Sequence, residues 1–153
     1  MAVYFVDTSA LAKRYVNEPG TRWIRSWIRR ETGNNIIISE LAMVEMYSVI
    51  ARRELQQDIS PSSAIRRREA FLYHALHDYD VIQVNNKTFI QSRDLVTRHV
   101  IYGLRSLDAI QLACAITART VIGQTLEFIS ADAKLLKAAA TEGFTTDDPN
   151  LHP

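Results

Sequence analysis

The chain has a single cysteine, Cys114, among its 153 residues, so it cannot form an internal disulfide or a cysteine-rich zinc site. Only five glycines and four prolines are present, which predicts long regular elements. The longest apolar run, residues 1–6, is far shorter than the ~20 residues that a membrane helix needs. No basic stretch precedes an apolar segment at the N-terminus, so we expect no secretory signal and a cytoplasmic protein that does not associate with membranes.

Neither sign of charge dominates, because 18 basic residues oppose 17 acidic ones and the formal net charge is +1. This balance excludes a simple polycationic coat for nucleic acid but leaves open an enzyme that acts on nucleic acid. Apolar residues make up 47% of the chain and charged residues 23%, as in ordinary globular domains. We therefore expect one globular domain over residues 1–153.

Short apolar segments alternate with helical patterns along the chain. The apolar segments predict strands at 1–6, 36–38, 81–84 and 126–129, and the tail 144–153 can add at most one edge strand. Between them the sequence predicts helices at 10–15, 21–30, 40–57 with Ser39 as its cap, 61–79, 85–101, 106–119 and 131–141. This alternation indicates an α/β fold with a mostly parallel sheet, in which ligands bind outside the carboxyl ends of the strands.

Four acidic residues occupy positions where an unpaired carboxylate is costly. Asp7 directly follows the first predicted strand, and Asp132 comes three residues after the end of another. Glu45 and Asp108 each interrupt a long uncharged stretch of a predicted helix. If the fold brings all four together, a divalent cation relieves their repulsion, and oxygen ligands suit Mg²⁺ or Mn²⁺. The chemistry that follows is metal-assisted hydrolysis of a phosphodiester.

Each of these acids also has a purely structural interpretation. Asp7 is placed to cap a helix, and Asp108 and Asp132 are placed in first turns, where the helix dipole favours an acid. Glu45 has no such role in mid-helix, and its structural alternative is a buried salt bridge, for which Arg105 is a candidate partner. Spacing alone leaves both interpretations open.

The four acids belong to four short motifs that follow one another along the chain. These are YFVDTSAL at 4–11, SELAMVE at 39–45, LRSLDAIQLA at 104–113 and FISADAKL at 128–135. Each motif by itself is weakly specific, but together, in this order and over nearly the whole chain, they resemble those of PIN-domain ribonucleases. The resemblance is specifically to the VapC-type toxins of bacterial toxin–antitoxin pairs.

The resemblance implies a PIN-like three-layer α/β/α fold around a central, mostly parallel sheet of four to five strands. The long interval between the second and third motifs implies a protruding helical pair near residues 40–79, a region that commonly contacts partners in the family. The implied activity is a divalent-metal-dependent endoribonuclease that uses Mg²⁺, with Mn²⁺ as a substitute. The implied partners are the RNA substrate, a cognate inhibitory antitoxin and a second copy of the chain in a homodimer.

The resemblance also assigns roles to individual residues. Its acidic positions, implied to be both catalytic and metal-binding, are Asp7, Glu45, Asp108 and Asp132. Supporting positions are Thr8, Ser9, Ser130 and Arg105. Gln111 stands at a position that varies more widely in the family.

Two other functions stay open at this point. One is a PIN-like interaction module without catalysis, although the complete set of four acids counts against it. The other is a metal-dependent phosphohydrolase with Asp7 as its nucleophile, although Ser9 stands where that chemistry usually has a second aspartate.

Arginine pairs and runs are a further feature of the sequence. Those at 29–30, 52–53 and 66–68 can contact RNA phosphates, but helix geometry spreads neighbouring arginines apart and favours a solvated face. Trp23 and Trp27 can stack on bases, but their helical spacing favours the protein core or a dimer interface.

Overall fold

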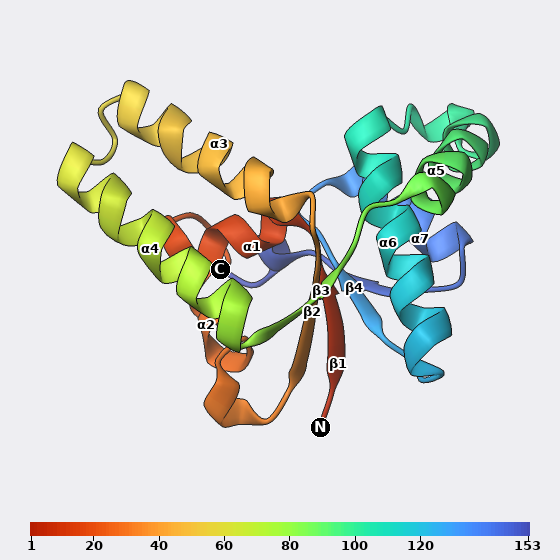
Figure 1. The fold of residues 1–153 in the computed structure, drawn as a ribbon, viewed down its shortest axis with the longest axis horizontal. Helices are drawn as coiled ribbons and strands as arrows, with labels where there is room; N and C mark the ends of the chain where they lie inside the picture. Colours follow the sequence, from red (N-terminus) through yellow and green to blue (C-terminus); the bar gives the residue numbers. More distant parts are fainter.

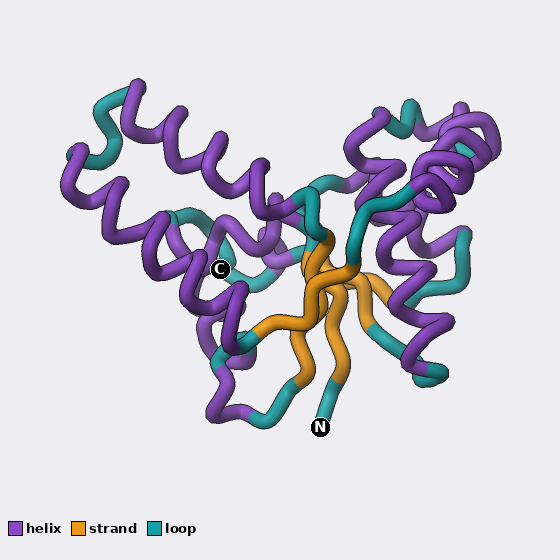
Figure 2. Tube along the Cα trace, viewed as in Figure 1, coloured by secondary structure: helices purple, strands orange, loops and turns teal.

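The computed structural model describes all 153 residues and centres on a five-stranded, fully parallel sheet in the order β3-β2-β1-β4-β5 (Figures 1 and 2). The strands are β1 (Val3–Val6), β2 (Asn35–Ser39), β3 (Tyr79–Ile82), β4 (Glu127–Ile129) and β5 (Thr145–Asp147). The predicted α/β class is confirmed, and the C-terminal tail supplies the edge strand β5.

Helices cover both faces of this sheet, which confirms the three-layer α/β/α arrangement (Figure 1). One layer contains α1 (Thr8–Tyr15), α2 (Thr21–Trp27), α3 (Ala42–Leu55) and α4 (Pro61–His77). The other contains α5 (Asn86–Arg98), α6 (Ser106–Ile122) and α7 (Ala133–Thr141). Helices α3 and α4 pack side by side and extend away from the sheet (Figure 1). None of the helices is long and apolar enough to span a membrane.

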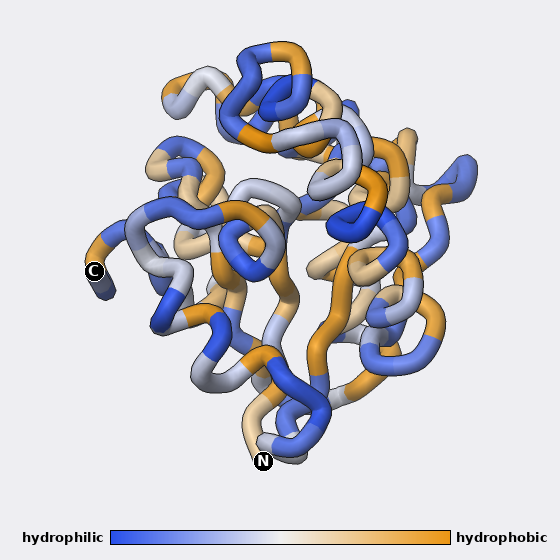
Figure 3. The backbone as a smooth tube through the Cα atoms, turned by 90° about the vertical axis from the view of Figure 1, so that its left-hand side faces the viewer, coloured by the Kyte–Doolittle hydropathy of each residue, from blue (hydrophilic) through white to orange (hydrophobic).

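Successive residues of each strand pack into opposite layers, as expected for a parallel sheet covered on both faces. The side chains toward α1–α4 include Val6, Ile36, Ile38 and Ile129. The side chains toward α5–α7 include Phe5, Ile37 and Phe128, and the two phenylalanine rings stack 5.5 Å apart. Along the helices that face the viewer in Figure 3, hydrophilic residues are interspersed with hydrophobic ones, consistent with one buried and one solvated side.

The sheet has a topological switch point between β1 and β4, where the order in which strands are added changes sides. From β1 the chain moves outward to β2 and β3, and then crosses to β4 and β5 on the other side of β1. The backbone N–H of Asp7 donates to the carbonyl of Ile129 at 2.9 Å, which joins the carboxyl ends of β1 and β4. In α/β sheets this kind of switch point is where ligands bind.

Several element ends differ from those that the sequence predicts. The helix expected at 40–57 begins only at Ala42, because Glu40 and Leu41 form a turn after β2, in which the N–H of Leu41 donates to the hydroxyl of Ser39 at 3.1 Å. The helix expected at 61–79 ends at His77, because Tyr79 belongs to β3 and its buried phenol lies 2.9 Å from that of Tyr15. Both differences arise because contacts between distant elements outweigh local helix propensity.

Other differences follow from local backbone geometry. The region expected to be helical at 85–101 divides into α5 and a 3₁₀ turn at Val100–Tyr102, and the helix at 21–30 stops at Trp27. Helix α6 continues past the predicted end to Ile122 and stops at Gly123, whose φ of 65° lies in the left-handed region.

Candidate active site

Asp7 lies at the sheet's switch point and is almost fully buried, with 5% of its surface exposed. It follows β1 directly and caps α1, where its Oδ2 accepts from the N–H of Ser9 at 3.2 Å. The same oxygen accepts from the hydroxyl of Ser9 at 2.5 Å and from that of Ser130 at 3.0 Å. Residues from the ends of β1 and β4 therefore hold one carboxylate oxygen.

The environment of Asp7 favours its neutral form. Burial raises the pKa of this carboxyl, the bonds from Ser9 and Ser130 oppose that shift, and the nearby charge of Glu45 adds to it, so that the pKa is about 6. Near neutral pH, the carboxylate of Asp7 is therefore ionised without a nearby positive charge that compensates it.

Glu45 is fixed on α3 by two polar side chains from other elements. Its Oε1 accepts from the hydroxyl of Thr8 at 2.9 Å and from the amide of Gln111 at 2.7 Å. Gln111 also donates to the Thr8 hydroxyl at 2.9 Å, so α1, α3 and α6 meet in one buried polar cluster. The structural alternative for Glu45, a salt bridge to Arg105, is not formed, because Arg105 lies against Asp108 and Asp132.

Arg105 lies at the outer edge of the site, between Asp108 and Asp132. Its Nε donates to Asp108 Oδ2 at 3.1 Å, and its Nη2 lies 3.5 Å from Asp132 Oδ2. The guanidinium is 76% exposed, so this is a solvent-screened bridge. Burial raises the pKa of Asp108, and the bond from Arg105 acts in the opposite direction.

The four acids line a common hollow of about 300 Å³ at the carboxyl ends of the strands. They are accompanied by Thr8, Ser9, Ser48, Val49, Arg52, Arg105 and Leu107. Ser130, the remaining predicted residue, is fully buried beneath Asp7 rather than on the wall. Structural roles also hold for three of the acids, since Asp7 caps α1 and Asp108 lies in the first turn of α6, while Asp132 caps α7 rather than lying in its first turn.

The chemistry of this donor set fits a hard divalent cation. Carboxylate oxygens are the ligands that Mg²⁺ and Mn²⁺ prefer, and Asp7 Oδ1 and Glu45 Oε2 have no hydrogen-bond partner in the protein. The buried Oε1 of Gln111 also lacks a partner. No three acidic side chains lie close enough together to hold one ion directly in this structure. Coordination by three of them therefore requires a change of side-chain positions or bridging water.

Two polar residues of the site are not among the catalytic or supporting positions that the sequence motifs predict. Gln111 follows Asp108 by three residues and therefore lies on the same side of α6. Its side-chain amide, which can both donate and accept hydrogen bonds, stands next to apolar residues in the sequence. Arg52 belongs to an arginine pair that the sequence assigns to a solvated face, but it lines the hollow. The spacing Glu45–Arg52, two helical turns, is the signal that places both on one side of α3.

Trp23 and Trp27, which were considered as base-stacking residues, belong to the packing around α2. Trp27 is buried in the core, and the half-buried Trp23 stacks on His152 with ring centroids 4.1 Å apart. Neither residue lines the acidic hollow.

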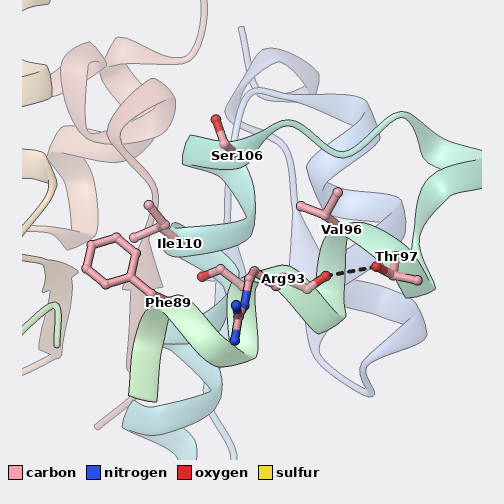
Figure 4. A pocket seen from close by; sticks show the side chains of 7 residues that line it. Phe89, Arg93, Val96, Thr97, Ser106 and Ile110 are labelled. Atoms are coloured by element: carbon pink, nitrogen blue, oxygen red, sulfur yellow. Dashed lines mark hydrogen bonds between the residues drawn. The ribbon is translucent and has the colours of Figure 1, made fainter. Parts of the chain in front are cut away.

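A different hollow of about 600 Å³ lies between α5 and α6 (Figure 4). Phe89, Val96 and Ile110 supply most of its wall, and Thr97 hydrogen-bonds the carbonyl of Arg93 at its rim. No carboxylate lines it, so it lacks the groups that hydrolysis needs.

Comparison with known proteins agrees with this geometry. A family model described as PIN domain matches residues 4–141, so the chain belongs to the PIN domain family. Within that family it is 29% identical over 147 residues to Ribonuclease VapC47 of Mycobacterium tuberculosis, which covers 95% of this chain and 96% of the relative.

Two solved structures have the same fold. VapC20 of Mycobacterium tuberculosis, described as a sarcin–ricin loop cleaving toxin, has a TM-score of 0.64 and 16% identity over 94% of this chain and 97% of its own. A toxin–antitoxin complex from Klebsiella pneumoniae has a TM-score of 0.59 and 20% identity over 95% of this chain and 97% of its own.

Proposed function

We propose that this protein is a divalent-metal-dependent endoribonuclease and the toxin of a toxin–antitoxin pair. The observation that carries the proposal is the convergence of Asp7, Glu45, Asp108 and Asp132 on one hollow at the switch point of a PIN-domain sheet. A relative that shares nearly the full length of the chain is named a ribonuclease, which supports the same activity.

In this proposal Asp7, Glu45 and Asp108 hold Mg²⁺, or Mn²⁺ in its place, directly or through water. Such an ion supplies Lewis-acid activation of water and stabilises negative charge on the departing oxygen of the phosphodiester. Asp132 helps to hold a second ion or orients the attacking water. Thr8 fixes Glu45, and Ser9 and Ser130 fix Asp7, so these hydroxyls position the acids rather than react.

Arg105 supports the site through charge. It neutralises part of the repulsion between Asp108 and Asp132, and its exposed guanidinium is accessible to an RNA phosphate. The phosphohydrolase alternative fits less well, because Ser9 stands where that chemistry usually has a second aspartate, and its hydroxyl donates to Asp7 instead.

The remaining features of the proposal concern assembly and location. The complex from Klebsiella pneumoniae supports an antitoxin partner for this chain, and the family resemblance supports a homodimer in the cytoplasm. We further propose that residues 1–153 act as one PIN-like domain whose α3–α4 pair offers a surface to partners. Sedimentation of the isolated chain measures the oligomeric state directly.

The deciding experiment is cleavage of a mixed cellular RNA pool by antitoxin-free protein, with the cut ends mapped. The conditions are Mg²⁺, Mn²⁺ and chelator, together with Asp7→Asn and the matched control Asp94→Asn, which changes an exposed acid on α5. We expect cuts that need both metal and Asp7 and that the control retains. If folded wild-type protein makes no cuts under any condition, the chain is an interaction module or acts on a small phosphoester instead.

A further inference from the structure

A hollow of about 600 Å³ lies directly beside the acidic one, between α1 and α3, and we call it the second hollow. It is distinct from the hollow between α5 and α6. Ser9, Val49 and Arg52 line both the acidic hollow and the second hollow, so the two adjoin each other. The rest of its wall consists of Ala12, Lys13, Glu18, Arg53, Gln56, Ala131 and Asn150. A strand bound across the acidic site therefore passes next to this space.

The two hollows carry opposite charge. Four carboxylates and two guanidiniums line the acidic one, whereas three cations and the single carboxylate of Glu18 line its neighbour. A polyanion is repelled at the first hollow unless a metal ion is bound there, and attracted at the second.

Two of the three cations in the second hollow are already engaged. Lys13 is 3% exposed and donates to Glu18, to the carbonyl of Pro19 and to Asn150. Arg53 forms ion pairs with Glu18 and Asp58. The side chain of Arg52 makes no hydrogen bond or ion pair and is exposed, so its guanidinium keeps all of its donors available.

The position of Arg52 relates it to the acids. It follows Glu45 on α3 by seven residues, which places the two on the same side of the helix and about 10 Å apart along its axis. Arg52 therefore lies where the acidic hollow opens into its positively charged neighbour. A planar guanidinium at that point can hold two oxygens of one phosphate.

We propose that Arg52 binds a phosphate that neighbours the scissile one, and that the hollow between α1 and α3 receives the RNA strand as it leaves the acidic site. This inference rests on the proposed function, because it needs RNA as the substrate. Arg52 is then a substrate-binding residue beside the acidic site.

The binding test uses a fluorescent pool of short single-stranded RNA of random sequence, in Mg²⁺, with Asp7→Asn as the uncleaving parent. Each phosphate contact that is lost lowers the slope of log affinity against log salt by about 0.7 for a single strand. We expect that loss when Arg52→Gln is added to the parent. The matched control is Arg66→Gln, which removes an exposed arginine on α4 that has no ion pair and lines neither hollow. Arg52→Lys keeps the slope but binds more weakly, because it loses the planar fork.

A kinetic test with the Asp7-containing enzyme separates binding from chemistry. Removal of an interaction that is equal in the ground and transition states raises KM and leaves kcat unchanged. We expect Arg52→Gln to raise KM about 10-fold at low salt, since a charge-assisted bond is lost. The melting temperature of Arg52→Gln stays that of the wild type, because the side chain has no partner in the protein.

Three results would overturn the inference. If Arg52→Gln and Arg66→Gln have the same salt slope and the same KM, Arg52 binds no phosphate. If Arg52→Gln changes only the inhibition of cleavage by the copurified antitoxin, the hollow belongs to a protein partner. If the Asp7→Asn parent binds no RNA and the wild type cuts none, the proposed function is wrong and this inference fails with it.

Discussion

Replacement of Asp7 by asparagine tests the electrostatic account of the acidic site without reference to catalysis. The folded carboxyl has a pKa of about 6, above its ordinary value of 3.8, so the native state binds the proton more tightly than the unfolded chain does. Ionisation of Asp7 therefore costs stability as the pH rises above 3.8, and the cost is complete above pH 6. Below 3.8 both states are protonated and the cost disappears.

The magnitude follows from the difference between the two pKa values. A difference of about 2 units corresponds to about 3 kcal/mol at neutral pH. Solvent screening does not reduce this figure, since the side chain is 5% exposed. The asparagine side chain is nearly isosteric with aspartate and uncharged but accepts the serine donors less strongly, so we expect a net gain of about 1–3 kcal/mol. That gain raises the melting temperature by roughly 2–4 °C per kcal/mol for a domain of this size.

The assay is urea unfolding of metal-free wild type and Asp7→Asn at pH 7.5 and again near pH 4. The variant should be more stable at pH 7.5, and the difference should shrink toward zero near pH 4. Addition of Mg²⁺ should reverse the order, because a ligand that binds only the native wild-type site stabilises it. If the variant is less stable at both pH values, or if the difference does not depend on pH, the burial of an uncompensated charge at Asp7 is refuted.

Three further predictions concern other parts of the molecule. Thr8→Val removes one of the two donors to Glu45, so cleavage should fall about 10-fold while urea unfolding shows a loss of about 1 kcal/mol. Burial by itself raises the pKa of Glu142, but the hydrogen bonds and charges of His99 and Arg98 together outweigh it and the pKa is lowered, so this carboxylate stabilises the fold near neutral pH. Glu142→Gln should therefore cost about 1 kcal/mol at pH 7 and progressively less as the pH falls through the pKa of the carboxyl; an equal cost at acid pH would contradict the pairing. Phe128→Ala opens a cavity against Phe5 and should cost about 3–5 kcal/mol in urea unfolding, whereas a cost below about 1 kcal/mol would mean that the sheet core is not packed as described.

Much of the fold follows from patterns that are local in the sequence. Apolar segments separated by helical periodicity identify the strands, because a strand buried on both faces must be apolar throughout. The ends of the elements follow less well. Glu40 and Tyr79 look helical by their neighbours, but Glu40 lies in the turn that the hydroxyl of Ser39 caps and Tyr79 belongs to a strand through its buried phenol.

The candidate site, too, follows only in part from the sequence alone. The sequence by itself places the four acids, because a charge at a strand end or within an apolar helix stands out against its neighbours. It also orders them along the chain in the pattern of the family motifs. Their gathering in one hollow agrees with this reading, and the switch point between β1 and β4 explains why the first and last of them lie close together.

Only the tertiary structure decides which partner each charged group takes. Arg105 pairs with Asp108 and Asp132 rather than with Glu45, and Gln111 reaches across from α6 to hold Glu45. Arg52 and its neighbour Arg53 are equivalent in the sequence, yet one is unpaired and the other is bound to acids of the fold. A hydrogen bond acts over about 3 Å, so these choices depend on how helices far apart in the chain are packed, which the order of residues along one helix does not specify.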